Sequence, residues 1–203
     1  MHPHWYSASP DIQRKLISLY ILSLASNSPS TLPASPTSPS ALFNTELEYT
    51  RSPHDLAAVL RWALRHVQLE GDFFGIGSSS EPWKWYKNFS EAERAASYPS
   101  SAFSQFLTPQ IPPAHLQLLL ATLEIVSSLA AHSDYSGISG SKVSKLLGLW
   151  LLTARRAEEN DDWPAFYARW ERAGRILEHL FLAQIRCVYS CSIARCDLSV
   201  FQG

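Results

Sequence analysis

Residues 111–132 read IPPAHLQLLLATLEIVSSLAAH, and this stretch decides the fold class. Leu116, Leu119 and Leu123 recur every three or four residues, which is the period of an α-helix. Most of the remaining positions are apolar as well, so the helix should be covered on more than one side. The pattern predicts a long central helix from Pro112 to about His132.

The same helical period appears on both sides of this stretch. Before it, helices are expected at 11–25, at 52–69, in short pieces at 81–89 and from 90, and at 102–107. After it, they are expected at 141–159 and from 161 to about 186. No hairpin dipeptide separates two alternating segments. The sequence therefore predicts an all-α fold of about six to eight helices.

Composition excludes several classes of function. The 203 residues carry a formal net charge of -1, and 46% are hydrophobic. This balance gives no strong field toward nucleic acid, so no nucleic-acid partner is expected. No uninterrupted apolar run approaches about 18 residues, so no transmembrane segment is expected. The three cysteines all lie after residue 186, which argues against a disulfide framework and favours a cytoplasmic protein.

Composition also divides the chain. Residues 26–40 are unlike the rest, because twelve of the fifteen are Ser, Thr or Pro. Such a tract has little apolar surface to bury and predicts a disordered loop. The expected parts are an N-terminal helix at 1–25, a disordered Ser/Thr/Pro-rich loop at 26–45, a helical core at 46–186 and a divergent tail at 187–203. This last stretch has weaker periodicity, and the sequence leaves open whether it extends the last helix or is an unrelated tail.

Three serines of this tract precede proline, namely Ser28, Ser35 and Ser38. Proline-directed kinases modify such pairs, although a plain solvated loop has the same composition. The sequence leaves both interpretations open.

No chemical site can be assembled from spacing. The chain has no P-loop, nucleophile-elbow, zinc-protease or dinucleotide-binding motif. His2 and His4 supply two ligands at most, and Cys187, Cys191 and Cys196 lack a CxxC pair. We therefore expect no metal, no cofactor and ordinary thiols.

The order of motifs is more informative than any one of them. Leu60-Arg61-Trp62-Ala63-Leu64-Arg65, the Pro-Pro entry into the central helix, and Lys142-Val143-Ser144-Lys145-Leu146-Leu147-Gly148 follow one another along the chain. Together they resemble the helical domain of Rho GTPase-activating (RhoGAP) proteins. The resemblance implies a RhoGAP-like helical core, and 46–186 would be part of such a domain.

A fungal family is a closer resemblance. It is carried by Trp83-x-x-Tyr86-x-x-Phe89, Ala130-Ala131-His132, Gly137-x-x-Gly140-x-Lys142, Tyr167-x-x-Trp170 and Glu178-His179-Leu180-Phe181. Over roughly residues 50 to 186 the chain resembles the RhoGAP-like domain of fungal morphogenesis proteins, the bud-formation suppressor and meiotically up-regulated (Msb1/Mug) proteins. The resemblance implies a cell-polarity protein that acts with Rho-family GTPases at sites of polarised growth, such as the bud neck, cell tip or septum.

The resemblance also bears on catalysis, because a GTPase-activating protein inserts an arginine beside the γ-phosphate. Residues 1–10 contain no arginine, and Arg51 is only a remote candidate. Lys142 and Gly148-Leu149 replace the asparagine and the Ala-Pro pair of active members. We therefore expect an inactive adaptor and no enzyme. An active protein that uses Arg51 or an upstream arginine, and a scaffold segment without GTPase contact, remain the alternatives.

Four cations are candidates for binding the partner: Arg61, Arg65, Lys142 and Lys145. Arg61 and Arg65 are four apart on one helix face, which suits an acidic partner and equally a solvated surface. The expected partners are a Rho-family small GTPase or other polarity proteins. Trp83, Tyr86, Phe89, Trp150 and Trp170 are expected in the core.

Overall fold

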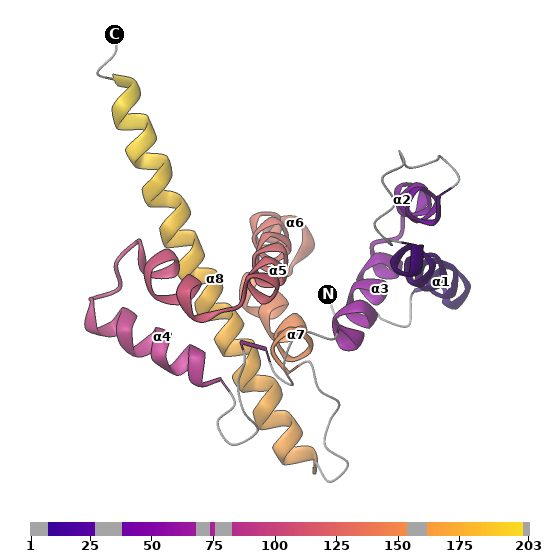
Figure 1. The fold of residues 1–203 in the computed structure, drawn as a ribbon, viewed down its shortest axis with the longest axis horizontal. Coiled ribbons are helices and arrows are strands. Elements are labelled where there is room, and N and C mark those ends of the chain that lie inside the picture. The colour runs from indigo at the N-terminus through magenta and orange to yellow at the C-terminus, as the bar shows by residue number, and fades with distance from the viewer. Residues whose placement is uncertain (1–7, 27–37, 68–73, 76–82, 154–161, 201–203) are drawn as a thin grey trace. The chain divides into compact units, whose positions relative to one another are not determined.

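The computed structural model describes residues 8–26, 38–67, 74–75, 83–153 and 162–200 (Figure 1). Every regular element in these ranges is helical, which confirms the predicted all-α class. The chain divides into two compact units, Met1–Leu64 and Arg65–Gly203. The elements are α1 (Pro10–Ser26), α2 (Pro39–Tyr49), α3 (Pro53–His66), α4 (Lys84–Ala95), η2 (Phe103–Leu107), η3 (Thr108–Gln110), α5 (Pro113–Ala131), α6 (Ser133–Ser136), α7 (Gly140–Leu152) and α8 (Trp163–Val200).

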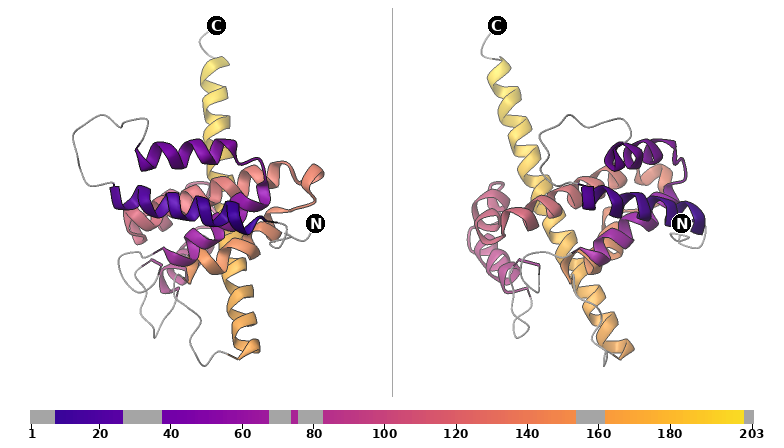
Figure 2. Two further views of the ribbon diagram at one scale, coloured as in Figure 1. Left: turned by 90° about the vertical axis from the view of Figure 1, so that its right-hand side faces the viewer. Right: turned by 45° about the vertical axis from the view of Figure 1, so that its right-hand side comes forward.

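The first unit is built on the packing of α1 against α2, which lie side by side in both views of Figure 2. The Tyr20 ring lies 5.4 Å from that of Phe43, between centroids, and makes an edge contact with Trp62 of α3 at 6.4 Å. Leu16 is fully buried. The buried Asp55 carboxylate accepts a hydrogen bond of 2.6 Å from the Ser9 N–H, which fixes the start of α1 to α3.

Helix α2 corrects the predicted disordered loop at 26–45, because it begins at Pro39. Ser38 is its N-cap and accepts a hydrogen bond from the Ala41 N–H, and Pro39 occupies the first turn, where its missing N–H costs nothing. The Ser/Thr/Pro-rich tract therefore contains the start of a helix, which its composition alone does not indicate. Residues 27–37 of the predicted loop lie outside the described residues.

The second unit is organised around α8, which packs against α7, α5 and η2 (Figure 1). Its fully buried face presents Ala173, Leu177 and Leu180. Leu119 and Leu123 of α5 are equally buried, as the helical spacing predicts. The central helix of the sequence is thus a core helix of this unit.

Two glycines allow the closest helix contact, between α7 and α8. A Cβ on Gly148 would lie 2.6 Å from the Ala173 carbonyl oxygen, and one on Gly174 would lie 2.9 Å from the Lys145 Cα. Real side chains do not tolerate such distances from backbone atoms. The backbones of α7 and α8 can approach because both positions lack a side chain.

One expected boundary lies inside a helix. Residues 84–95 form a single helix, whereas a new segment was expected from Ser90. The Ser90 hydroxyl donates to the Lys87 carbonyl oxygen at 3.0 Å instead of capping a new helix. Helix α8 continues past residue 186 to Val200, so of the two interpretations left open for 187–203 the backbone follows the extension of the last helix.

Helix α5 bears on the expectation that no segment spans a membrane. By length and composition, Pro113–Ala131 is apolar enough to do so, with a mean hydropathy of 1.5. A core helix passes the same test, and α5 packs against α7 and buries the polar His115 and Thr122. This packing buries one face of α5, and 28% of the stretch is buried in the structure.

Candidate functional site

A buried carboxylate joins α4 to α8. Glu93 of α4 is 0% exposed, and its Oε2 lies 2.7 Å from the Nε2 of His179. Its other oxygen, Oε1, accepts a hydrogen bond from the Nη2 of Arg186. His179 also contacts Tyr86, whose hydroxyl lies 2.9 Å from the Nδ1. We call these four residues the Glu93 network.

One hydrogen bond of this network has a fixed direction. Glu93 can only accept as a carboxylate, so the His179 Nε2 donates to it. The direction of the bond between the Tyr86 hydroxyl and Nδ1 depends on the protons of the His179 ring. Burial, and secondarily the negative charge of Glu93, raise the pKa of Tyr86 above 10.0, which keeps this hydroxyl protonated.

The order tyrosine, histidine, carboxylate resembles a catalytic relay, but its electrostatics favour a structural role. A nucleophilic hydroxyl needs a lowered pKa or an adjacent base that is free to take its proton. Here burial raises the pKa of Tyr86, so less of its hydroxyl is ionised than in a free tyrosine. The network is suited to holding α4 on α8.

Sequence reasoning missed this network, although a signal is present. Tyr86 and Glu93 are seven apart on α4, and His179 and Arg186 are seven apart on α8. Seven residues are close to two turns, so each pair shares one helix face. Complementary residues at the same spacing on two helices indicate a polar seam, but the sequence does not say which helices meet.

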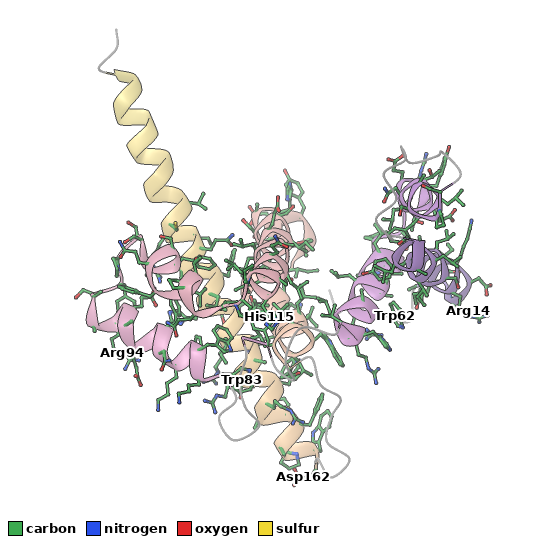
Figure 3. All side chains as sticks on the ribbon, viewed as in Figure 1. Arg14, Trp62, Trp83, Arg94, His115 and Asp162 are labelled. Atoms are coloured by element: carbon green, nitrogen blue, oxygen red, sulfur yellow. The ribbon has the colours of Figure 1, made fainter. Side chains whose placement is uncertain are left out.

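A second cluster fixes residues 74–75 to the second unit. The Gly75 N–H donates to the Nδ1 of the buried His115 at 2.9 Å, and the Phe74 ring packs on Trp85 and His115. Figure 3 labels His115 on α5. Gly75 has φ +77, and a Cβ there would lie 2.4 Å from the Trp85 ring. Only glycine fits this position without displacement.

The predicted arginines occupy different environments. Arg51 is exposed in the connection between α2 and α3. Arg61 is half-buried on α3. Arg65 is exposed, and its guanidinium lies 5.8 Å from the centre of the Trp150 ring, which is a cation–π distance. Of the three, Arg65 is therefore held against a residue of α7.

The predicted lysines lie in the first turns of α7. Lys142 and Lys145 are both half-buried, and neither forms an ion pair with any residue that the structure describes. Ser139 caps this helix by accepting a hydrogen bond from the Lys142 N–H. The Cα of Lys145 faces Gly174, so its backbone is part of the α7–α8 contact.

The aromatic predictions are confirmed in part. Trp83 and Phe89 are buried, and Tyr86 is half-buried in the Glu93 network. Trp150 and Trp170 were expected in the core, and both are only half-buried. Trp150 is the ring beneath Arg65, so part of its surface is covered by a cation rather than by apolar side chains.

An open groove of about 550 Å³ lies between α5 and α8. Its apolar lining includes Leu120, Ala121, Ile185 and Val188, and Glu124 adds a negative charge. Leu120 and Val188 are exposed. The groove therefore offers apolar area on the surface of the second unit.

Within the described ranges, no group of three or more His, Cys, Asp or Glu could hold a metal ion. Cys187 is half-buried on α8. His2 and His4 lie outside the described residues, and so do the side chains of Cys191 and Cys196.

A comparison with protein families matches residues 77–197 to the meiotically up-regulated protein Msb1/Mug8 domain. No curated protein and no solved structure matches the chain. The matched segment contains the Glu93 network, Lys142 and Lys145, whereas the Leu60–Arg65 motif lies before it. The match also extends beyond residue 186. The expectation that similarity to the family stops at Arg186 is therefore wrong, because residues 187–197 of the expected divergent tail belong to the match.

Proposed function

Because the chain belongs to the Msb1/Mug8 domain family of meiotically up-regulated proteins, we propose that it is a helical adaptor domain that binds a protein partner without accelerating a reaction. The proposed partner is a Rho-type GTPase in its GTP-bound form. The setting is the cytoplasmic face of sites of polarised growth. The choice of a GTPase as the partner rests on the resemblance of the sequence to RhoGAP domains. Similarity to the Msb1/Mug8 domain family does not by itself name a partner.

The observation that carries the proposal is a set of cations along α7. Lys142, Lys145 and the Arg65 guanidinium above Trp150 all lie on or against this helix, which has 13 residues and is about 20 Å long. The two lysines have no carboxylate partner among the described residues. Cations without acidic partners among the described residues are suited to an acidic partner surface, such as the switch region of a GTPase.

The inactive character of the adaptor is supported by where its arginines lie. Arg14 is within α1 and pairs with Asp11 at 3.6 Å. Arg51 is exposed in the short connection before α3, so its position suits the alternative of an active protein. Docking area and transition-state stabilisation are separable, so a domain can bind a GTPase without supplying the arginine that speeds hydrolysis.

Binding is tested by pull-down of the full chain against a panel of Rho-type GTPases loaded with a non-hydrolysable GTP analogue or with GDP. We expect retention of at least one GTPase in the GTP-analogue form. Lys142→Glu should weaken it at least about tenfold, because a like charge then faces the acidic partner. Arg14→Glu makes the same change of charge on α1 and should leave binding unaltered. Failure to bind any GTPase in either form would support the scaffold alternative and overturn the proposal.

Catalysis is tested by single-turnover GTP hydrolysis with the purified chain. The rate of the bound GTPase should be unchanged. Stimulation of about a hundredfold or more would refute the inactive adaptor, since a supplied arginine contributes about 10³–10⁵. If Arg51→Ala then abolished that stimulation, Arg51 would be the catalytic arginine.

A further inference from the structure

We propose that Ser38 is a phosphorylation site for a proline-directed protein kinase, and that its phosphate stabilises α2 of the first unit. This inference is independent of the proposed GTPase partner. It concerns one of the three Ser-Pro pairs of the sequence, and the structure describes Ser38 but not Ser28 or Ser35.

The local geometry makes Ser38 accessible to such a kinase. Its backbone is extended, with φ -63 and ψ 146, close to the polyproline II conformation. Pro39 follows directly and Ser38 is half-exposed. Its Oγ accepts from the Ala41 N–H at 3.2 Å, so the hydroxyl proton is not used in that bond. Ser38 itself is therefore extended, whereas Pro39 begins α2, so a kinase that binds the Ser-Pro pair must open the first turn of this helix.

The transfer is an ordinary phosphoryl transfer from ATP. The bond between the γ-phosphorus and its bridging oxygen breaks, and that oxygen leaves with the electron pair on ADP. The Ser38 Oγ forms the new bond to phosphorus, and its proton goes to the catalytic aspartate of the kinase.

Helix α2 is sensitive to this charge because it is weakly stabilised. It has 11 residues, shorter than isolated helices need, and none of them is fully buried. Its first turn lacks an acid and its last turn lacks a base, while Glu46 and Glu48 lie at the end where the helix dipole disfavours negative charge. Its contacts to α1 include the Lys15–Glu46 ion pair of 2.7 Å and the packing of Tyr20 on Phe43.

A phosphate at the N-cap adds what this helix lacks. Its oxygens can accept from the Ser40 and Ala41 N–H groups, and its negative charge lies at the favourable end of the dipole. The serine hydroxyl offers one weaker acceptor, at 3.2 Å from the Ala41 nitrogen. Phosphorylation should therefore shift α2 toward its helical, α1-bound form.

The test uses the full chain, a cyclin-dependent or mitogen-activated kinase, and ATP. A variant with Ser28→Ala and Ser35→Ala leaves Ser38 as the only Ser-Pro pair in the tract. We expect mass spectrometry to find phosphate on Ser38, and Pro39→Ala to abolish it while the capping hydroxyl is kept. Amide hydrogen exchange in 40–49 should slow by about two- to fivefold on phosphorylation, with no change in α5.

Two results would overturn the inference. One is that the kinase leaves Ser38 unmodified in this variant. The other is that Ser38 is phosphorylated while exchange in α2 stays the same or becomes faster. Ser38→Asp, which keeps both a capping oxygen and a negative charge, should reproduce part of the slowing, whereas Ser38→Ala should speed exchange in the unmodified chain.

Discussion

Replacement of Glu93 by glutamine is the most direct test of how the second unit is held together. The substitution keeps the shape of the side chain and removes its charge. Glu93 is 0% exposed and accepts hydrogen bonds from both His179 and Arg186, so Glu93→Gln leaves two donors facing a neutral amide. The NH2 group of the glutamine would face one of these donors, and two donors cannot form a hydrogen bond with each other.

The expected loss follows from the burial of the three groups. Removing one partner of a fully buried ion pair costs about 3–5 kcal/mol, and a hydrogen bond to a charged group contributes about 1.5–3 kcal/mol. The side chains of His179 and Arg186 are 25% and 35% exposed, so water can replace some of what they lose. We therefore expect the free energy of unfolding to fall by about 2–3 kcal/mol.

Urea unfolding followed by circular dichroism measures this loss, and the chain offers a matched control. Glu171 pairs with Arg175 one turn away on the exposed side of α8, at 2.8 Å. Glu171→Gln should cost about 0.5 kcal/mol or less. A double-mutant cycle of Glu93→Gln with Arg186→Met should give a coupling of at least about 1 kcal/mol. If Glu93→Gln cost no more than Glu171→Gln, the network would not be what joins α4 to α8.

Two further predictions concern stability in the second unit. Gly75→Ala should lower the free energy of unfolding by about 2–4 kcal/mol, because its Cβ would meet the Trp85 ring. Gly137 is the matched control, because it also has a positive φ but no atom lies within 4 Å of a Cβ there. Gly137→Ala should cost about 1 kcal/mol in the same urea assay. The raised pKa of Tyr86 means that the unfolded chain loses this proton first as pH rises past 10.0, so stability should decrease from there upward. Tyr86→Phe should reduce the decrease between pH 9 and pH 11 by comparison with the native protein, and Tyr135→Phe, at an exposed position, should not; an equal decrease in all three would contradict the shift.

The helices could be predicted because their signal is local. The central helix was placed within one residue at each end, since the apolar period and the Pro-Pro start are contained in the segment itself. The helix expected from residue 52 is α3, and the Ser52 Oγ accepts from the Asp55 N–H at 3.3 Å. Helix α2 was missed because its start lies inside a tract whose average composition favours a loop. One serine at the N-cap and one proline in the first turn are enough to begin a helix there.

The site could not be predicted in the same way, because its partners are distant in sequence. Glu93 and His179 are 86 residues apart, and nothing in either segment identifies the other. The contact between α7 and α8 depends on Gly148 and Gly174, which read in sequence as weak points of a helix. Gly148 was considered only as a departure from the RhoGAP pattern, whereas in the fold it is required where it stands.

The charged residues of the second unit separate into two roles according to whether the chain supplies their partner. Glu93 is buried and both of its oxygens are bound within the unit, so its charge contributes to folding and cannot meet another molecule. Lys142 and Lys145 keep part of their surface and have no acid among the described residues, so their charge adds little to folding. The proposed binding function therefore rests on the lysines of α7, and the buried Glu93 is not part of it. Charge reversal at Lys142 that abolished folding would show that this separation is wrong.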